Sequence, residues 1–517
     1  MRPRRRLLLL VAVAAVAGAV IAGTLLTSGK EEGIPGPNRP TIVQDDPLLL
    51  FRPPRVVDRT LGRLRALGAD WVRLNAGWSL IAPKPSSPRR PSFDAADPGA
   101  YPPGAWEPLD RAVRLARDHG LQVMIDIAFW APRWAVARPF GPAGRQRYGI
   151  DPREYARFAQ AVARRYSGKF AQLPQAVAFA IWNEPNYAVF WMPQWVRAGR
   201  RFAVASAHDY RELVYAAHPA IRRAAPDSLV LIGNTSPTGP ARPDSVADSV
   251  APLRFLREMA CVDGRYRPVR TGGCRRFRPL PGDGWAHHPY SQSTPPERSD
   301  RFADNVPIGD LGRLTGALAR LAREGRTART LPVWITEYGY ETNPPDPLQK
   351  VGLYAQARWI GEAERIAFAN PAVRSYAQFL LRDLGEQPGS TARRRWSDYQ
   401  SGLELPDGTP KPALQAFAHT LVVRRARDGR ALLLWGHLRA GSGERRFRVS
   451  ARRPDGTWRP LPAFAEGRRT DADGYFALTQ TVDPGALFPV DPRDTFRLEL
   501  LERGRWRAAG LPLIGAG

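Results

Sequence analysis

The chain has 517 residues, 43% of them apolar, so it can bury a large core and should form about two or three domains. Its 51 prolines occur together with 15 tryptophans, a composition that indicates long ordered loops and excludes a largely disordered chain. The net charge of +27 is scattered along the chain, and no helix-turn-helix, zinc-finger or aromatic RNA-binding motif accompanies it. We therefore expect no nucleic-acid partner.

The first 29 residues are typical of an export segment. Residues 1–6 are basic, and residues 7–26 are about 20 uncharged, mostly apolar residues, just long enough to span a bilayer. The basic flank predicts that the rest of the chain is exported. This pattern favours a membrane anchor slightly over a cleaved signal peptide, and with either one the protein would be extracellular, secreted or tethered. Residues 30–40, rich in glycine and proline, are expected to form a linker.

The sequence contains two cysteines, Cys261 and Cys274. Export permits a disulfide between them, and closing a loop of this length would stabilise the fold by roughly 3 kcal/mol. A metal site is the weaker alternative, because two thiols without nearby histidines do not complete a zinc site. We expect a disulfide, no metal and no cofactor.

Strand-like and helix-like patterns alternate through residues 41–424, the predicted first domain. The expected helices, in chain order, cover 55–67, 106–119, 151–166, 207–225, 311–323, a segment capped by Asp346-Pro347, and 412–422. The expected strands cover 42–51, 71–74, 121–127, a run that ends at Glu184, 228–232, 331–338 and 373–381. Counted generously, the alternation gives eight strand–helix repeats, which predict a (β/α)8 barrel. A doubly wound sheet is the alternative, but no glycine-rich nucleotide loop follows an early strand.

The pattern changes at about residue 425. From there to residue 517, short strand-like runs are separated by Asp-Gly, Gly-Ser and Pro turns. This pattern of short strands and turns predicts a separate antiparallel β domain, a small sandwich, after the barrel.

The clearest chemical signal is residues 178–186, an apolar run that stops at Asn183, Glu184 and Pro185. Proline cannot continue a central strand, so Glu184 should lie at the carboxyl end of a buried strand. The active site of a (β/α)8 barrel is built at these strand ends. Asn183 and Glu184 can both reach one pocket only if the strand ends or bulges there, because successive strand residues face opposite ways.

Two further strand ends carry polar groups, His288-Pro289-Tyr290 and Glu337-Tyr338. Two carboxyl groups facing each other across a pocket are what glycoside hydrolysis needs, one to protonate the leaving oxygen and one to attack the anomeric carbon. Each glutamate taken singly could instead be a structural strand-end carboxylate.

Three motifs together resemble those of a known enzyme class. The segments 181–186, 288–290 and 334–339 look like the motifs of retaining glycoside hydrolases whose two catalytic glutamates end barrel strands four and seven, nearest to families 5 and 39. The resemblance covers roughly residues 41–420. It implies that Glu184 is the acid/base, that Glu337 is the nucleophile, and that their carboxyl groups lie about 5–5.5 Å apart.

The resemblance and the aromatic residues near the strand ends give the candidate substrate-binding residues: Arg73, Trp78, Trp130, Asn183, His288, Tyr290 and Tyr338. By resemblance, Asn183 would hold the sugar 2-hydroxyl, Arg73 and Tyr290 would keep Glu337 ionised and aimed, and His288 would line the pocket. Trp130 could stack on a sugar ring or anchor a loop.

The sequence therefore predicts a retaining glycosidase that acts on a β-linked polysaccharide or glycan, with carbohydrate as its partner. The alternative is a catalytically inactive carbohydrate-binding or cell-wall-associated protein on the same fold. The presence of both glutamates argues against it, because a protein that only binds need not keep both.

Overall fold

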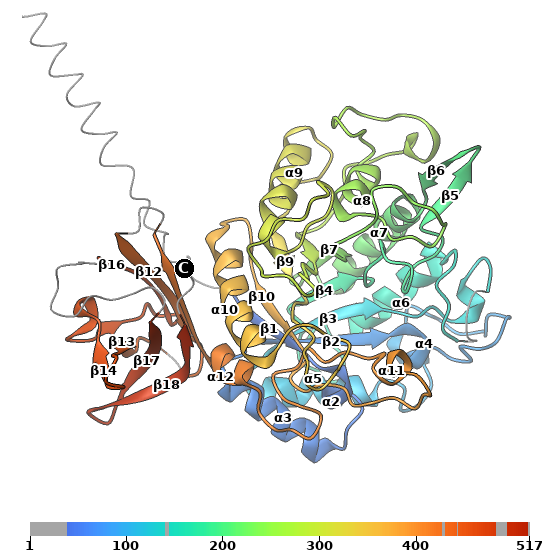
Figure 1. Cartoon of the computed structure of the whole chain (residues 1–517). Coiled ribbons are helices and arrows are strands. Elements are labelled where there is room, and N and C mark those ends of the chain that lie inside the picture. Colours follow the sequence, from blue (N-terminus) through green and yellow to red (C-terminus); the bar gives the residue numbers. More distant parts are fainter. Residues whose placement is uncertain (1–38, 140–143, 427–429, 442, 482–493, 515–517) are drawn as a thin grey trace, which may run out of the picture.

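The computed structural model describes residues 39–139, 144–426, 430–441, 443–481 and 494–514 (Figure 1). The predicted anchor or signal peptide at residues 7–26 and nearly all of the predicted linker lie outside the described residues. Within the described part of the chain, no helix is both long and apolar enough to cross a bilayer.

Eight parallel strands form the barrel, in the order β10-β1-β2-β3-β4-β7-β8-β9. They are β1 (Thr41–Gln44), β2 (Trp71–Gly77), β3 (Gln122–Ala128), β4 (Ala178–Ile181), β7 (Leu229–Thr235), β8 (Gly284–His287), β9 (Val333–Ile335) and β10 (Tyr376–Phe379). Hydrogen bonds from Arg374 N to Val333 O (2.8 Å) and from Phe379 N to Tyr338 O (2.7 Å) join the two ends of this sheet. The predicted barrel is confirmed, and it brings the carboxyl ends of all these strands to one mouth.

Helices surround the strands (Figure 1). The longer ones are α3 (Pro54–Ala66), α5 (Glu107–Asp118), α6 (Pro152–Arg165), α7 (Ser206–Ala224), α8 (Pro252–Met259), α9 (Leu311–Arg323) and α10 (Leu353–Ala369). Each buries an apolar face against the sheet; on α9, for example, Leu314, Leu318 and Leu321 are buried. The predicted cap of α6 forms as expected, because Asp151 accepts hydrogen bonds from the N–H groups of Arg153 and Glu154.

The predicted strand at 42–51 is too long. The strand β1 ends at Gln44, and a short helix, α2 (Asp46–Leu49), follows it. Asp45 is the cause, since its carboxylate accepts a hydrogen bond from Leu48 N at 3.0 Å and so caps the helix. This turn places Asp46 at the mouth of the barrel.

Two predicted helix limits are also wrong. Asp346-Pro347 caps no helix: Asp346 accepts a hydrogen bond from Leu348 N in a tight turn, and α10 begins only after Gly352. The predicted helix 412–422 ends at Ala418, where α12 (Pro412–Ala418) gives way to β11 (His419–Arg425). The β-branched side chains in 420–423 favour this strand, so the first strand of the β domain starts before the predicted boundary at residue 425.

The C-terminal domain is all-β, as predicted. One antiparallel sheet contains β11, β12 (Ala431–Leu438) and β16 (Tyr475–Thr481). The other contains β13 (Arg446–Arg452), β14 (Trp458–Pro460), β15 (Arg468–Arg469), β17 (Thr495–Glu502) and β18 (Arg505–Ile514). Apolar side chains from both sheets form a core of their own, separate from the core of the barrel.

A buried ion pair joins the two domains. Glu364 of α10 accepts a hydrogen bond from the Arg439 guanidinium and lies 2.7 Å from Nδ1 of His437 in β12. Arg439 also donates to the Thr41 hydroxyl of β1 at 3.1 Å. Phe368 of the barrel packs against Tyr475 of the β domain, with ring centroids 5.1 Å apart. The β domain is therefore packed firmly onto the helix and strand that adjoin it.

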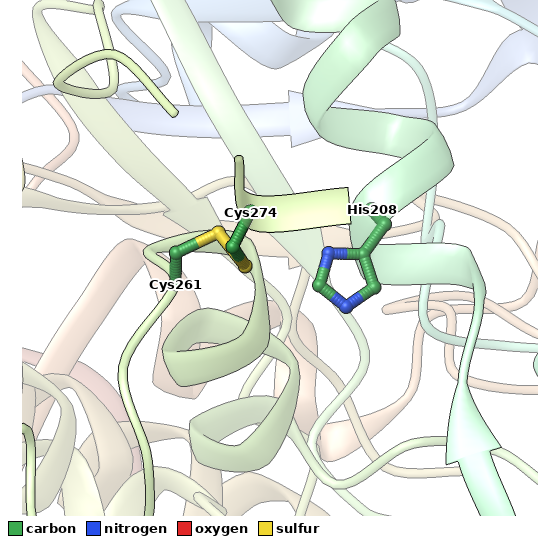
Figure 2. Close-up of side chains that lie close together, drawn as sticks. All are labelled: His208, Cys261 and Cys274. Carbon is green, nitrogen blue, oxygen red and sulfur yellow. A yellow bond between two sulfur atoms is a disulfide. The ribbon is translucent and has the colours of Figure 1, made fainter. Parts of the chain in front are cut away.

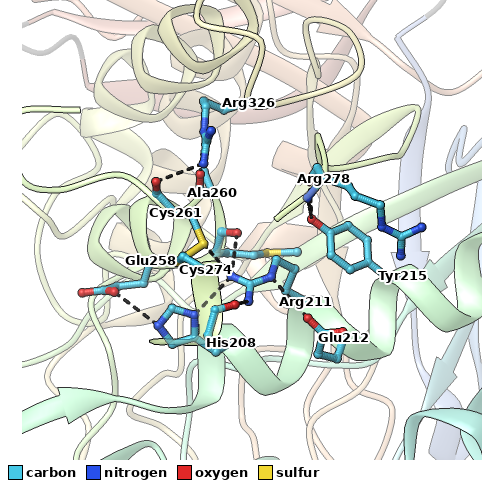
Figure 3. The surroundings of a disulfide bond; sticks show 12 residues. His208, Arg211, Glu212, Tyr215, Glu258, Ala260, Cys261, Cys274, Arg278 and Arg326 are labelled. Carbon is cyan, nitrogen blue, oxygen red and sulfur yellow. Dashed lines mark hydrogen bonds and ion pairs between the residues drawn. A yellow bond between two sulfur atoms is a disulfide. The ribbon is translucent and has the colours of Figure 1, made fainter. Parts of the chain in front are cut away.

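A disulfide closes the segment between α8 and β8. Cys261 and Cys274 are bonded at 2.00 Å, 13 residues apart in sequence (Figure 2). Arg211 of α7 is buried beside them and donates to Cys261 Sγ at 3.0 Å and to the Gly273 carbonyl at 2.6 Å (Figure 3). This segment is thus fixed both covalently and by hydrogen bonds to α7.

Candidate active site

Glu184 lies on a kinked segment directly after β4. Trp182 (φ +60°) and Glu184 (φ +41°) both have left-handed backbone conformations, which residues with side chains rarely adopt. The N–H of Trp182 donates to the Tyr155 hydroxyl at 3.0 Å, and the N–H of Glu184 donates to the Asn234 carbonyl at 2.9 Å. These hydrogen bonds hold the kink, which lets Asn183 and Glu184 line the same cavity although a regular strand would point them apart.

Glu337 follows β9 and is held through both carboxylate oxygens. The Arg73 guanidinium donates to Oε1, and the Tyr290 hydroxyl donates to Oε2 at 3.0 Å. Arg73 is fully buried, so its charge lies in a medium of low polarity next to the carboxylate. The two donors fix the orientation of Glu337 and supply it with a positive charge.

The two glutamates face each other closely. A carboxyl oxygen of Glu184 lies within 4.8 Å of one of Glu337. Paired carboxyl groups of retaining glycosidases lie about 5–5.5 Å apart, whereas inverting enzymes need about 6.5–9.5 Å to admit a water molecule. The close approach of these oxygens agrees with the retaining arrangement better than with the inverting one.

His288 lies between the two glutamates and forms a hydrogen bond of 2.9 Å from Nδ1 to Glu184 Oε1. Burial lowers the pKa of His288 to about 4, so the imidazole is neutral near pH 7 and gives Glu184 no positive charge. Burial raises the pKa of Glu184, and the nearby charge of Glu337 adds to this effect. Glu184 is thus set up to hold a proton, while Glu337 has a guanidinium beside it.

Behind the glutamates lies a buried polar network around Arg73. Its Nη2 donates to Asp126 Oδ2 at 2.8 Å and to Asn183 Oδ1 at 3.0 Å, and its Nη1 donates to Gln44 Oε1. Burial opposes the charge on Arg73, but Asp126 and Glu337 outweigh it and raise the pKa of Arg73 above its ordinary value. The guanidinium therefore stays charged and holds three cavity residues, Gln44, Asn183 and Glu337, in one arrangement.

The glutamates open into a cavity of about 770 Å³. Its aromatic lining includes Phe129, Tyr187 and Phe190 on the side of Glu184, and Tyr399 from the long segment after β10. Tyr187 is 38% exposed and Tyr399 is 45% exposed. Exposed aromatic faces that line a cavity suit the apolar faces of sugar rings.

Four carboxyl groups line this cavity, those of Asp46, Glu184, Glu337 and Glu341, and no lysine or arginine of the described residues does. This is the reverse of the whole chain, in which 76 basic residues outnumber 49 acidic ones. Burial raises the pKa of Asp46 to about 6, and burial together with nearby carboxylates raises the pKa of Glu341 to about 7. Gln349 donates to Glu341 at 2.7 Å.

Two predicted substrate contacts are wrong, because their side chains belong to the core. Trp78 begins the short helix α4 (Trp78–Ile81) and stacks on Phe158 of α6, with ring centroids 5.6 Å apart. Tyr338 is buried behind Tyr290, and its hydroxyl donates to Tyr340 at 3.0 Å. Both follow strand ends in sequence, but the chain turns each ring away from the cavity.

Three more predicted contacts do not line the cavity: two hold the glutamates, and one anchors a loop beside it. Arg73 and His288 are fully buried and reach Glu337 and Glu184, so they hold the glutamates and do not line the cavity. Trp130 donates to the Val189 carbonyl at 3.3 Å and acts as a loop anchor, while its neighbour Phe129 lines the cavity. Of the predicted substrate-binding residues, Asn183 and Tyr290 line it.

Two clusters in the described residues have the composition of metal sites. One is His208 with Cys261 and Cys274, but these sulfurs are bonded to each other and offer no thiolate (Figure 2). The other is Glu184, His288 and Glu337. The Arg73 guanidinium already occupies Glu337 there, and a fixed positive charge disfavours a second cation at the same carboxylate.

A family model described as cellulase (glycosyl hydrolase family 5) matches residues 53–306. The match contains Glu184, His288 and Tyr290 and ends before Glu337. No curated protein matches the chain.

Among solved structures, the chain is similar to a monomeric beta-xylosidase from Caulobacter crescentus CB15, with 15% identity, a TM-score of 0.47, and coverage of 87% of this chain and 95% of that one. It is similar to GH5_18 from Streptomyces cattleya in complex with GlcNAc, with 16% identity, a TM-score of 0.44, and coverage of 74% and 79%. It is also similar to a beta-glucuronidase from Bacteroides uniformis, with 12% identity, a TM-score of 0.44 and coverage of 92% of this chain. The chain spans about half, 46%, of the length of that glucuronidase. The family match confirms the predicted resemblance to the family 5 glycoside hydrolases over residues 53–306, about half of the chain.

Proposed function

We propose that this protein is a retaining glycosidase that cleaves a β-linked glycan in two displacement steps. In the first step, Glu184 gives its proton to the glycosidic oxygen as the bond from that oxygen to the anomeric carbon breaks. The Glu337 carboxylate attacks the anomeric carbon and forms a glycosyl ester. In the second step, Glu184 takes a proton from water, the resulting nucleophile attacks the same carbon, and Glu337 leaves as carboxylate.

The observation that supports this proposal most is the close approach of the two carboxyl groups, whose oxygens lie within 4.8 Å of each other in a cavity large enough for sugar rings. Their environments differ in the direction that the two roles need. Burial raises the pKa of Glu184, whereas Glu337 accepts hydrogen bonds from the Arg73 guanidinium and the Tyr290 hydroxyl. Asn183, held by Arg73, is the side chain that would bind the 2-hydroxyl of the sugar.

The charge of the cavity supports an uncharged glycan as substrate. A uronate in this cavity would bring its carboxylate among four carboxyl groups, and no described lysine or arginine lines the cavity to bind it. Matched aryl β-glucosides and β-glucuronides, which differ only at C6, test this point. We expect kcat/KM to favour the glucoside, and equal or faster turnover of the glucuronide would contradict it.

The mechanism is tested with a panel of aryl β-glycosides and a fluorosugar that traps the intermediate. Wild-type protein should release the aryl group with retained anomeric configuration, followed by NMR, and a 2-deoxy-2-fluoroglycoside should label the peptide that contains Glu337. Glu337→Gln should abolish both, whereas Glu324→Gln, a carboxyl change at the exposed end of α9, should change neither. An initial product of inverted configuration would refute the two-step mechanism, and binding without turnover would favour the inactive alternative.

We also propose that the protein works outside the cytoplasm, secreted or tethered through residues 7–26. The N-terminal sequence supports this, as does the Cys261–Cys274 disulfide, since such bonds persist in oxidising compartments. Cell fractionation, with mass measurement of the N-terminus, tests it. Recovery of the protein only from the cytoplasm, with free thiols, would contradict it.

A further inference from the structure

Asn234 occupies an unusual position at the end of β7. It is fully buried, has a left-handed backbone (φ +48°), and lies in an irregularity where the pairing of β7 with β8 shifts between Gly233 and Thr235. Asparagine tolerates this conformation better than most residues with side chains. Asn234 does not line the cavity, so it does not act on a sugar directly.

Asn234 holds the segment that carries Glu184. Its backbone carbonyl accepts the N–H of Glu184 at 2.9 Å, and its side-chain Nδ2 donates to the carbonyl of Trp182 at 2.6 Å. Trp182 and Glu184 are the two residues of this segment with left-handed backbones. One buried residue therefore fixes both sides of the kink that aims Glu184.

The same side chain reaches toward Glu337 by two routes. Its Oδ1 accepts a hydrogen bond from the hydroxyl of Thr336, the residue before Glu337, at 3.1 Å. Its Nδ2 also donates to Asp126 Oδ1 at 2.9 Å, and the other oxygen of Asp126 holds Arg73, which binds Glu337. Asn234 is thus bonded to β3, to the segment after β4 and to the end of β9.

We propose that Asn234, with Asp126, is a positioning residue that aims Glu184, the proton donor, relative to Glu337. This inference rests on the proposed function, because it concerns the geometry of that reaction. Catalytic groups must be held within about 0.5 Å of their productive geometry. Asn234 is the one described side chain that hydrogen-bonds both to the Glu184 segment and to the residue before Glu337.

A purely structural role for Asn234 predicts a different experimental result from a positioning role. If Asn234 only stabilises the fold, its loss lowers the amount of folded protein and reduces turnover of every substrate equally. If it aims Glu184, its loss matters most when the leaving group needs a proton. Dinitrophenolate leaves without protonation, whereas an unsubstituted phenolate needs it.

The test is Asn234→Gly, which suits the left-handed backbone and removes only the side chain, with Thr235→Val as the matched control. Thr235 is equally buried on the same irregular strand end, and its hydroxyl contacts His287 and Trp285 but neither glutamate. On folded protein, we expect kcat/KM of Asn234→Gly for phenyl β-glycosides to fall by about 10²-fold, the scale for a misplacement of 1 Å. The loss for dinitrophenyl β-glycosides should be clearly smaller, and Thr235→Val should show no such difference.

A second variant keeps the inference testable if Asn234→Gly does not fold. Asp126→Asn preserves volume, but in either orientation its NH2 group meets a donor, on Arg73 or on Asn234. It should also lose more on phenyl than on dinitrophenyl substrates. Equal losses on both substrates, or unchanged turnover, would overturn the positioning role. If the wild-type protein hydrolyses neither substrate, the proposed function fails first.

Discussion

Two buried glutamates, one in the cavity and one between the domains, have similar partners, but their pKa values are shifted in opposite directions. Glu184 and Glu364 each form a hydrogen bond of less than 3 Å to Nδ1 of a buried histidine. Burial raises the pKa of Glu184. Burial also opposes the charge on Glu364, but Arg439 and His437 outweigh it and lower the pKa of Glu364 to about 2.

The guanidinium makes the difference. Arg439 bonds directly to Glu364, whereas Arg73, the buried arginine near Glu184, bonds to Glu337, Asn183, Asp126 and Gln44. The histidines differ little, because burial lowers the pKa of both. A buried carboxyl group with its own cation is a permanent charge that joins two domains, whereas one without a cation keeps a proton that it can give away.

The largest effect is expected at Glu184, the glutamate without a cation of its own. Glu184→Gln removes the proton donor while keeping size and hydrogen-bonding capacity, so kcat/KM for phenyl β-glycosides should fall by about 10²–10⁴-fold, the usual contribution of general acid catalysis. Dinitrophenyl glycosides should suffer less in the first step. Added azide should restore turnover of these activated substrates, because it attacks the glycosyl ester without needing a base, and the product should be the β-glycosyl azide. No azide product would argue against Glu184 as the acid/base.

Substitution of Glu364, the glutamate paired with Arg439, should lower stability and leave the chemistry intact. Glu364→Gln leaves Arg439 buried without its carboxylate, a loss that costs about 3–5 kcal/mol of unfolding free energy when one partner of a buried ion pair is removed. Denaturant titration measures it, and kcat of the folded fraction should stay at the wild-type value. The double variant Glu364→Leu, Arg439→Met should recover part of the loss, because neither charge is then left alone. A stable Glu364→Gln would show that the ion pair does not hold the domains together.

The low pKa of Glu364 should also appear in the pH dependence of stability. Because the folded-state pKa of Glu364 lies below the unfolded value, its contribution to stability is complete above about pH 5 and is lost as pH falls toward 2. A shift of this size corresponds to about 3 kcal/mol. Urea midpoints measured between pH 6 and pH 2.5 should fall less steeply in Glu364→Gln than in wild type. Parallel curves would mean that Glu364 is not the group that titrates.

The sequence predicts the barrel and the glutamate pair for a definite physical reason. Each strand is a short apolar run that ends in turn or polar residues, so the strand ends can be recognised in the sequence. Barrel geometry then brings those ends to one mouth. Asn183-Glu184 and Glu337 stand at such ends, and the structure brings both glutamates into one cavity. Trp78 stands at one as well, but only packing decides that its ring turns toward Phe158.

The remaining site residues give weaker signals. Asp126 is a charged residue inside an apolar strand, which indicates a buried partner, but its partner Arg73 is 53 residues away and sequence spacing does not identify it. Tyr399 lies in a segment of 380–411 with little periodic pattern, and only the folded chain places it in the cavity. Asn234 lies near the end of an apolar strand, and its role depends on its hydrogen bonds with β3 and with the segments that follow β4 and β9.

The smallest effect tests the protonation of Glu184 directly. The proposed first step needs Glu184 protonated, so kcat/KM should decline as pH rises through its pKa, by about tenfold per pH unit, or 1.4 kcal/mol in barrier. Because burial raises this pKa, the decline should begin above the range of an ordinary glutamate, about 4.3. Dinitrophenyl substrates should lack this decline in wild type, and phenyl substrates should lack it in Glu184→Gln. A decline that persists in Glu184→Gln belongs to another group in the cavity, of which Glu341, with a pKa raised to about 7, is the first to examine by Glu341→Gln.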